Sequence, residues 1–175
     1  TATFTVNEYT VTYMDGNDVL DVDTFDFGQS ITPIADPTKV GYTFTGWDPA
    51  VPATMPAEDL TVFAQWQVNS YSITLNQVTG GTITVTVEGA PAGTTASTTA
   101  NYNAWGQLSE ETLNGYTFGN YVVTDANNTV IETPNNGFFM PASNVTVTAT
   151  FTVNEYTVTY MDGNEIGRAS CRERV

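Results

Sequence analysis

The sequence predicts a mainly β protein built from small modules in tandem, and two observations lead to this prediction. Residues 1–17 (TATFTVNEYTVTYMDGN) return unchanged as residues 148–164, an offset of 147 residues. Within this stretch apolar side chains alternate with threonine, which is the period-2 pattern of a half-buried strand. Because an internal repeat is a better guide to organisation than chain length, the chain is interpreted as a little more than one period of a repeating array.

The alternation changes phase inside the repeated stretch, and this change predicts the module boundaries. Apolar residues occupy even positions up to Val6 and odd positions from Tyr9 onward, so the inward face flips at residues 7–8. The same one-residue slip occurs at residues 69–70 and 154–155. We therefore predict the end of a preceding module at 1–7, repeat unit A at 8–70, repeat unit B (divergent) at 71–154, and the start of another unit A at 155–164.

The composition is that of an acidic, exposed β protein. The chain carries 19 acidic and 4 basic residues, no histidine, and a formal net charge of −15. This charge repels phosphate backbones and anionic lipids, which argues against nucleic acid or a bare membrane as a partner. No stretch approaches 18 consecutive apolar residues, so we expect no membrane insertion in this segment.

The last eleven residues, 165–175 (EIGRASCRERV), depart from the rest of the chain. They contain three of the four basic residues and the only cysteine, Cys171, and they interrupt the second copy of the repeat. This peptide resembles the translation of a common sequencing-library adapter, so we expect a non-native tail. The alternative is a genuine basic tail.

Unit A is predicted to consist of strands joined by turns. A first strand at 9–14 leads through the hairpin turn 15–18 (DGND) to a returning strand at 19–27. A turn-rich connection without helical periodicity follows. An aromatic strand at 41–47, a proline-rich crossing and an alternating strand at 60–68 complete the unit.

Unit B repeats this plan with different residues. Its first strand begins at Tyr71 and again places apolar side chains on odd positions. Residues 115–121 (GYTFGNY) match residues 41–47 (GYTFTGW), and residues 140–142 (MPA) match residues 55–57. The two units are therefore expected to share one fold.

Two features distinguish unit B from unit A. Residues 80–99, which are rich in glycine, alanine and threonine, are expected to form an inserted hairpin. Residues 108–113 are expected to form a short helical turn, because Ser109 can cap it and Glu110 and Glu111 favour its first turn.

These residues resemble a known family. Unit A resembles the Listeria/Bacteroides-type surface repeat, also called the internalin B-repeat, in strand 9–13, residues 36–39 (DPTK), residues 41–47 and the closing strand 60–66. Unit B resembles the divergent form of this repeat in residues 80–82, 115–118 and 140–151.

The resemblance implies a small β-grasp-like module, so the expected fold is mainly β, with tandem small β-grasp-like modules and at most one short helix. It implies a secreted or wall-attached bacterial protein located outside the cell or at its surface. The implied role is a non-catalytic stalk or spacer with an adhesive surface. The expected partners are neighbouring repeats of the same chain and a host or environmental glycan or protein.

The aromatic residues offer both a structural and a ligand-binding interpretation. The set shared with the family pattern is predicted to form the core, because a module of about 60 residues must build its interior from few large side chains. A sugar-stacking platform is the alternative interpretation of this set. The residues of the shared set are Tyr42, Phe44, Trp47 and Trp66. Tyr102 and Trp105 lie off the shared pattern and are the candidate ligand-binding residues, with a glycan-binding module in unit B as the alternative function.

An acidic cluster follows the first strand of unit A, at Asp15, Asp18, Asp21, Asp23 and Asp26. Its spacing does not fit an EF-hand loop, which needs glycine where Leu20 stands. We expect a solvated face in which Asp21 and Asp23 lie opposite Leu20 and Val22. A weak Ca²⁺ site near Asp15 and Asp18 is the alternative, and no other cofactor is expected.

No catalytic residue is predicted, so the chain is not expected to be an enzyme. Outside the tail it has neither histidine nor cysteine, the common general base and thiol nucleophile. Acid pairs such as Glu58–Asp59 are neighbours in sequence whose side chains diverge, whereas a glycosidase needs two facing carboxylates. Lys39 is expected to be a turn residue, with a side-chain cross-link to an asparagine as the alternative.

Overall fold

The computed structural model describes residues 1–89, 93–162 and 165–169. It divides into two compact units, unit 1 (Thr1–Asn69) and unit 2 (Ser70–Val175), which are described separately. Both are β structures, and the one helix among the described residues is the short 3₁₀ turn η1 (Pro134–Asn136). The fold class predicted from the sequence is confirmed. In the described part of the chain, no helix is long and apolar enough to cross a membrane.

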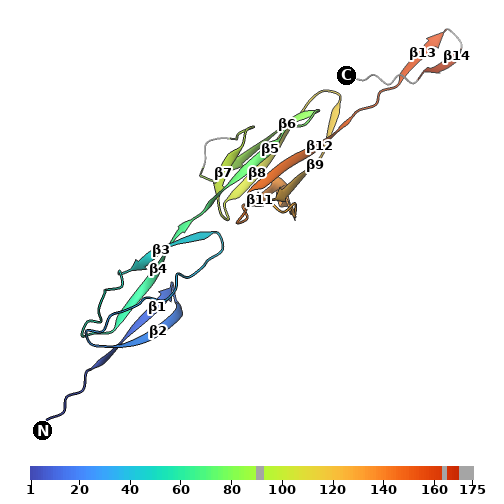
Figure 1. Cartoon of the computed structure of the whole chain (residues 1–175). Helices are drawn as coiled ribbons and strands as arrows, with labels where there is room; N and C mark the ends of the chain where they lie inside the picture. Colours follow the sequence, from blue (N-terminus) through green and yellow to red (C-terminus); the bar gives the residue numbers. More distant parts are fainter. Residues whose placement is uncertain (90–92, 163–164, 170–175) are drawn as a thin grey trace. The chain divides into compact units, whose positions relative to one another are not determined.

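Unit 1 is a four-stranded sheet with the order β2-β1-β4-β3 (Figure 1). Its strands are β1 (Glu8–Asp15), β2 (Asp18–Asp26), β3 (Tyr42–Asp48) and β4 (Leu60–Val68). β1 and β2 form an antiparallel hairpin, and β3 is antiparallel to β4. The first and last strands, β1 and β4, are parallel neighbours at the centre of the sheet.

Two connections supply the second layer of unit 1. The segments 27–41 and 49–59 bond to each other, since Ile31 donates its backbone N–H to Ala53 at 3.0 Å and Met55 donates to Gln29 at 2.8 Å. This pairing buries the Ile31 and Met55 side chains against three buried residues of the sheet. Those residues are Val11, Tyr13 and Val62. The proline-rich crossing is therefore part of the core.

The predicted orientation of the acidic strand β2 is wrong. Asp21 pairs with Tyr13 and Asp23 pairs with Val11, and directly paired residues share a face of the sheet. Both aspartates therefore lie on the side of the core, where burial, and then the charges of Asp23 and Asp21, raise the pKa of Tyr13. Val22 lies on the opposite face and is 50% exposed. The physical reason is that β2 is an edge strand, so carboxylates on its core side still reach water.

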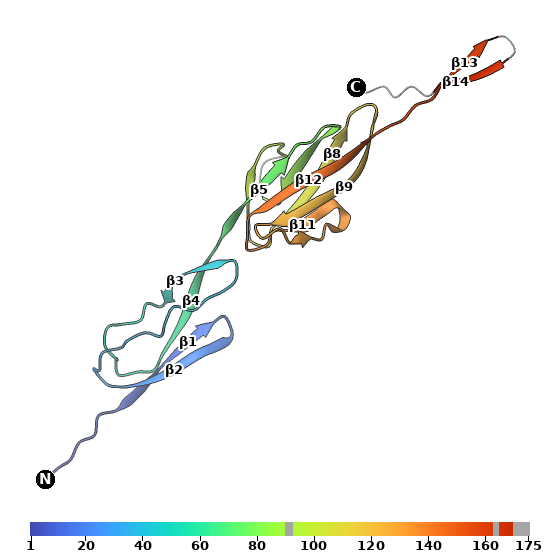
Figure 2. The same cartoon turned by 45° about the vertical axis from the view of Figure 1, so that its right-hand side comes forward.

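Unit 2 packs two sheets face to face (Figure 2). The five-stranded sheet has the order β10 (Val130–Ile131), β9 (Tyr116–Asp125), β12 (Val145–Val153), β5 (Ser70–Asn76), β7 (Thr98–Asn101). The three-stranded sheet has the order β11 (Gly137–Phe139), β8 (Trp105–Thr112), β6 (Gly81–Val87). Ile73 and Val147 of the first sheet share one core with Ile83, Leu108 and Phe138 of the second.

The helical turn predicted at 108–113 is wrong, because residues 105–112 form strand β8. Leu108 is buried while Gln107 and Ser109 are exposed, which is a strand alternation. β8 pairs with β6 on one side and β11 on the other. The Ser109 hydroxyl lies 2.6 Å from that of Thr84 on β6 and does not cap a helix. The ladder with β6 runs along residues 106–112 and outweighs the local helix signal of Glu110 and its neighbours.

The hairpin predicted at 80–99 is also wrong. β6 pairs with β8, whereas β7 pairs with β5 in the other sheet, so the two strands of the segment separate. Among the described residues of the segment, Val85 of β6 makes one antiparallel bridge, to Thr94, which precedes β7. Residues 90–92 of this segment lie outside the described residues.

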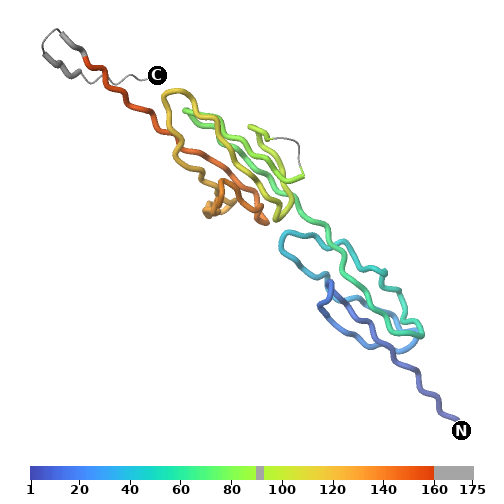
Figure 3. The backbone as a smooth tube through the Cα atoms, turned by 180° about the vertical axis from the view of Figure 1, so that it is seen from behind, coloured from blue at the N-terminus to red at the C-terminus, as the bar shows by residue number. Residues whose placement is uncertain are grey.

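The two units share a topology that their strand registers make explicit. In unit 1, β1 is parallel to β4, and β4 is antiparallel to β3. In unit 2, β5 is parallel to β12, and β12 is antiparallel to β9. The strands β5, β12 and β9 therefore correspond to β1, β4 and β3. Both β3 and β9 carry a register shift, between Phe44 and Gly46 in unit 1 and opposite Thr150 in unit 2. In each unit the chain starts on one central strand and ends on its parallel neighbour (Figure 3).

The second copy of the repeat forms a hairpin of its own. β13 (Val158–Asp162) is antiparallel to β14 (Glu165–Ala169), and Asp162 pairs with Glu165 as Asp15 pairs with Asp18. The first residues of the expected tail 165–175 thus stand in the place of β2. The remainder, 170–175 with Cys171, lies outside the described residues, and the origin of the tail stays a prediction.

Candidate functional site

An aromatic pair marks the outer face of the three-stranded sheet of unit 2. Trp105 on β8 pairs with Phe139 on β11, and their ring centroids lie 4.9 Å apart in an edge-to-face arrangement. The residues next to them are buried, Phe138 with its side chain in the core and Gly106 beside the Phe138 ring. Phe139 is 59% exposed, whereas Trp105 is half-buried. The pair therefore presents an apolar patch to solvent on an otherwise polar face.

The Trp105 ring is held in place by its neighbours. A Cβ atom on Gly137 would lie 2.2 Å from Cζ2 of Trp105, so the indole lies directly against the glycine backbone. Its Nε1–H donates to Oε1 of Gln107 at 3.3 Å. Gln107 in turn donates from Nε2 to the backbone oxygen of Asn136 at 2.9 Å. The pair, which we call the Trp105–Phe139 patch, is thus a preformed surface.

The structure places the two sequence-predicted residues differently. Trp105 lies on the exposed face of β8, whereas Tyr102 is half-buried in the turn between β7 and β8. Sequence reasoning missed Phe139, the ring that Trp105 contacts. The sequence did contain a signal for Phe139. At matching positions of the two units, Phe139 precedes the buried Met140, and the exposed Thr54 precedes the buried Met55. Unit 2 thus has an exposed phenylalanine at the position where unit 1 has an exposed threonine, and such a replacement indicates a surface residue outside the core.

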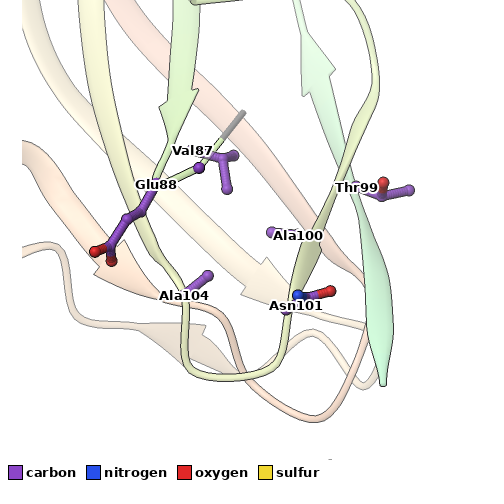
Figure 4. A pocket seen from close by; sticks show the side chains of 7 residues that line it. Val87, Glu88, Thr99, Ala100, Asn101 and Ala104 are labelled. Atoms are coloured by element: carbon purple, nitrogen blue, oxygen red, sulfur yellow. The ribbon is translucent and has the colours of Figure 1, made fainter. Parts of the chain in front are cut away.

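A cavity of about 200 Å³ lies at the end of β6 and beside β7 in the same unit (Figure 4). Its lining joins the apolar Val87, Ala100 and Ala104 to a single carboxylate, that of Glu88. A glycosidase requires two carboxylates that face each other across the substrate. This cavity does not provide that pair.

Unit 1 carries a second surface cluster, built around its only lysine. The Lys39 ammonium lies 3.0 Å from Oδ2 of Asp15, and Nε1 of Trp66 donates to Oδ1 of Asp15 at 3.0 Å. The same ammonium lies 5.3 Å from the ring centroid of Trp66 and 5.6 Å from that of Tyr42. The hydrogen bond from Lys39 holds the pKa of Asp15 below its usual value. Lys39 thus fastens the β1–β2 turn to the aromatic strands.

This cluster bears on the calcium alternative. The Asp15 carboxylate is already engaged by Lys39 and Trp66. Across residues 1–89, 93–162 and 165–169, no three histidine, cysteine or acidic side chains gather as a metal site. A Ca²⁺ site near Asp15 and Asp18 stays a prediction.

The shared aromatic residues pack in the same way in both units. Phe44 contacts Trp47 and Trp66 at centroid distances of 5.2 and 5.6 Å. The equivalent residue of unit 2, Phe118, contacts Tyr121 and Phe151 at 4.8 and 5.6 Å. Trp47 and Phe118 pack against the buried cores of their units. The predicted core role holds in part: all four shared rings of unit 1, those of Tyr42, Phe44, Trp47 and Trp66, are half-buried, and of these Trp47 packs against the buried cluster.

Tyr121 also engages one of the acidic residues of β8. Its hydroxyl donates a hydrogen bond to the Glu110 carboxylate. Burial, and then this carboxylate, raise the pKa of Tyr121. Glu110 is therefore a partner of a core tyrosine.

Comparison with known families assigns both units. Residues 9–65 match the family described as the Listeria-Bacteroides repeat domain, and residues 71–155 match the divergent InlB B-repeat domain. No solved structure matches the chain.

Several curated proteins are similar to the chain. Internalin H of Listeria monocytogenes (serovar 1/2a, strain EGD-e) is 34% identical over 132 residues, which is 68% of this chain and 21% of that protein. A putative membrane protein of Evansella cellulosilytica is 33% identical over 82 residues, 41% of this chain and 12% of that protein. A putative Gly-rich membrane protein of the same organism is 30% identical over 92 residues, 47% of this chain and 10% of that protein. The chain thus spans between 10% and 21% of the length of these relatives.

Proposed function

Because the chain belongs to the Listeria-Bacteroides and divergent InlB B-repeat families of bacterial surface proteins, we propose that it is a non-catalytic stalk segment. In this proposal it lies in a secreted or wall-attached protein and spaces a functional domain from the cell surface. Its partners along the stalk are neighbouring repeats of the same chain.

One observation carries the stalk proposal, namely the parallel pairing of the first and last strands in each unit. β1 is parallel to β4, and β5 is parallel to β12. The chain therefore enters a module at one end of a strand pair and leaves it at the other end. A hairpin-like module would return the chain to its starting side, whereas this arrangement advances it by about 30 Å for a nine-residue strand.

The residue that ends each module supports the same proposal. Asn69 donates its backbone N–H to Gly41 at 2.9 Å, and its side chain accepts from Thr43 at 2.6 Å. In unit 2, Asn154 donates to Gly115 at 2.7 Å, and its side chain accepts from Thr117 at 2.6 Å. Each asparagine thus fastens the end of the last strand to its own module before the chain continues.

Small-angle X-ray scattering tests the stalk proposal. Chains carrying one, two and three copies of the 147-residue period are expected to gain a constant increment in maximum dimension with each copy. Two modules per period predict an increment of roughly 60 Å. A radius of gyration that grows as it does for a compact globule would contradict the proposal.

A second candidate function is glycan binding by the Trp105–Phe139 patch. Flat apolar rings bordered by polar groups suit the faces of sugars, and Gln107 and Thr86 lie beside the patch on the same face. The acidic character of the chain favours a neutral saccharide over an anionic one.

A glycan array probed with the full chain tests this candidate. Binding is expected to fall at least tenfold with Phe139→Thr, which restores the residue type that unit 1 carries at Thr54, and with Trp105→Ala. Phe4→Ala is the matched control, since it removes another exposed ring, 94% accessible, and should leave binding unchanged. Thermal melts verify that the variants fold. Binding that survives both patch substitutions would exclude the patch.

A further inference from the structure

We propose that each module is a load-bearing element that resists tension in shear across its first and last strands. This inference rests on the stalk function proposed above, because a stalk that joins a cell to its target is pulled at both ends. It adds a mechanical property and assigns specific side chains to it.

The backbone ladder between the terminal strands sets the loading geometry. In unit 1, residues Val11–Met14 pair with residues Leu60–Phe63, and in unit 2, residues Ile73–Asn76 pair with residues Val145–Thr148. Tension enters at the start of the first strand and leaves at the end of the last. Since the ladder hydrogen bonds cross between parallel strands, this tension loads them together instead of one after another.

A side chain extends this ladder in both units. In unit 1, Oδ1 of Asp59, the residue before β4, accepts from the backbone N–H of Thr10 at 2.8 Å and from its hydroxyl at 3.1 Å. In unit 2, Oδ1 of Asn144, the residue before β12, accepts from the backbone N–H of Ser72 at 2.9 Å. The two pairs occupy equivalent positions, one residue beyond the first backbone pair of the ladder.

The chemistry shared by these two residues identifies their role. Aspartate and asparagine both offer Oδ1 as an acceptor, and in both units the donor lies on the first strand while the acceptor precedes the last. A hydrogen bond between the first strand and the residue before the last strand carries load when the two termini of the module are pulled apart. The asparagines that follow the last strands have a different partner: Asn69 bonds to Thr43 on β3 and Asn154 to Thr117 on β9, so they fasten the last strand to its antiparallel neighbour.

Single-molecule force spectroscopy on the full chain carrying Cys171→Ser tests the loading geometry. Unit 2 has more residues between its first and last strands than unit 1. Its unfolding therefore releases a greater length of chain, and the released length shows which unit has unfolded. With handles at the chain termini, unit 1 is expected to unfold at a force at least twice that found with handles on Glu8→Cys and Asp26→Cys. Those two positions pair at the open end of the β1–β2 hairpin, so that pull separates the hairpin bond by bond.

Substitutions at Asp59 test the side-chain assignment. Asp59→Ala is expected to lower the force for unit 1 under terminal pulling, to leave it unchanged under the 8–26 pull, and to leave the unit 2 event unchanged. Asp59→Asn copies the residue of unit 2 and is expected to retain the force. If Asp59→Ala abolishes the unit 1 event, Asn144→Ala makes the same test in unit 2.

Two results would overturn the inference. One is an equal unfolding force for unit 1 in both pulling geometries. The other is a force under terminal pulling that neither Asp59→Ala nor Asn144→Ala changes. Either result would leave the spacing measured by scattering intact, so failure of this inference is distinguishable from failure of the stalk proposal.

Discussion

Replacing Met55 by alanine is expected to lower the melting temperature of unit 1 by roughly 10–30 °C while leaving unit 2 native. Met55 is 1% exposed and belongs to a small cluster in which loops supply the layer that covers the sheet. Truncating a buried methionine costs about 2–5 kcal/mol, against a total stability of about 3–9 kcal/mol for a module of about 60 residues. For so small a domain, each kcal/mol shifts the melting temperature by about 4–8 °C.

Differential scanning calorimetry of the full chain measures this effect, and the chain offers a matched control. Met140 has the equivalent place in unit 2, is also 1% exposed, and belongs to a larger buried cluster. Met140→Ala should shift the unit 2 transition without unfolding that unit at ambient temperature. Met55→Leu conserves volume and should cost less than about 1.5 kcal/mol. A unit 1 transition unmoved by Met55→Ala would contradict the assignment of the loop layer to the core.

Replacing Gly81 by alanine is expected to destabilise unit 2 by about 1–3 kcal/mol, which lowers its melting temperature by roughly 5–20 °C. A Cβ atom at this position would lie 2.4 Å from two ring atoms of Phe151 and 2.7 Å from the backbone oxygen of Glu111. The ring belongs to the five-stranded sheet and the oxygen to β8, so the new atom meets both sheets. Alanine has better strand propensity than glycine, so propensity alone would predict no loss.

Thr82→Ala is the control for this prediction. It introduces the same side chain one position along β6, where the strand alternation turns it away from Phe151. We expect a change below about 1 kcal/mol, from strand propensity alone. Equal melting temperatures for Gly81→Ala and Thr82→Ala, measured by circular dichroism, would show that the sheets do not approach closely at Gly81.

The sequence was most informative where alternation and glycine or proline signals agreed. The strands around Tyr9 and Leu60 were predictable because apolar side chains alternate along each and bury one of its faces. The matching of Trp47 with Tyr121 and of Trp66 with Phe151 was also predictable, and the strand registers place these residues in equivalent positions. The family resemblance rested on the same residues.

The wrong predictions have one physical origin. Where the local sequence signals are ambiguous, the strand with which a segment pairs decides its secondary structure and the face on which its side chains lie. Residues 108–113 carry capping and acidic signals for a helix, yet pairing with β6 makes residues 108–112 part of a strand. Asp21 and Asp23 were assigned to solvent by polarity, but their register with Val11 and Tyr13 is a non-local property.

The candidate site was predictable only in part. Trp105 was identified because it lies outside the shared pattern. Its neighbour Phe139 comes from a strand 34 positions later, and only the pairing of β8 with β11 brings the rings together. Position along one strand can be read from a sequence, whereas the identity of the facing strand depends on the whole sheet.

In unit 1, and in the two packed sheets of unit 2, the strand that is synthesised last lies in the interior of a sheet, since β4 separates β1 from β3 and β12 separates β5 from β9. Until it leaves the ribosome, the earlier strands of unit 1 form at most a hairpin, which is marginal in water. Each unit therefore completes its fold only at the end of its own translation. A nascent chain that stalls just before residue 60 or 145 exposes unpaired strand edges, and is a substrate for chaperones and proteases.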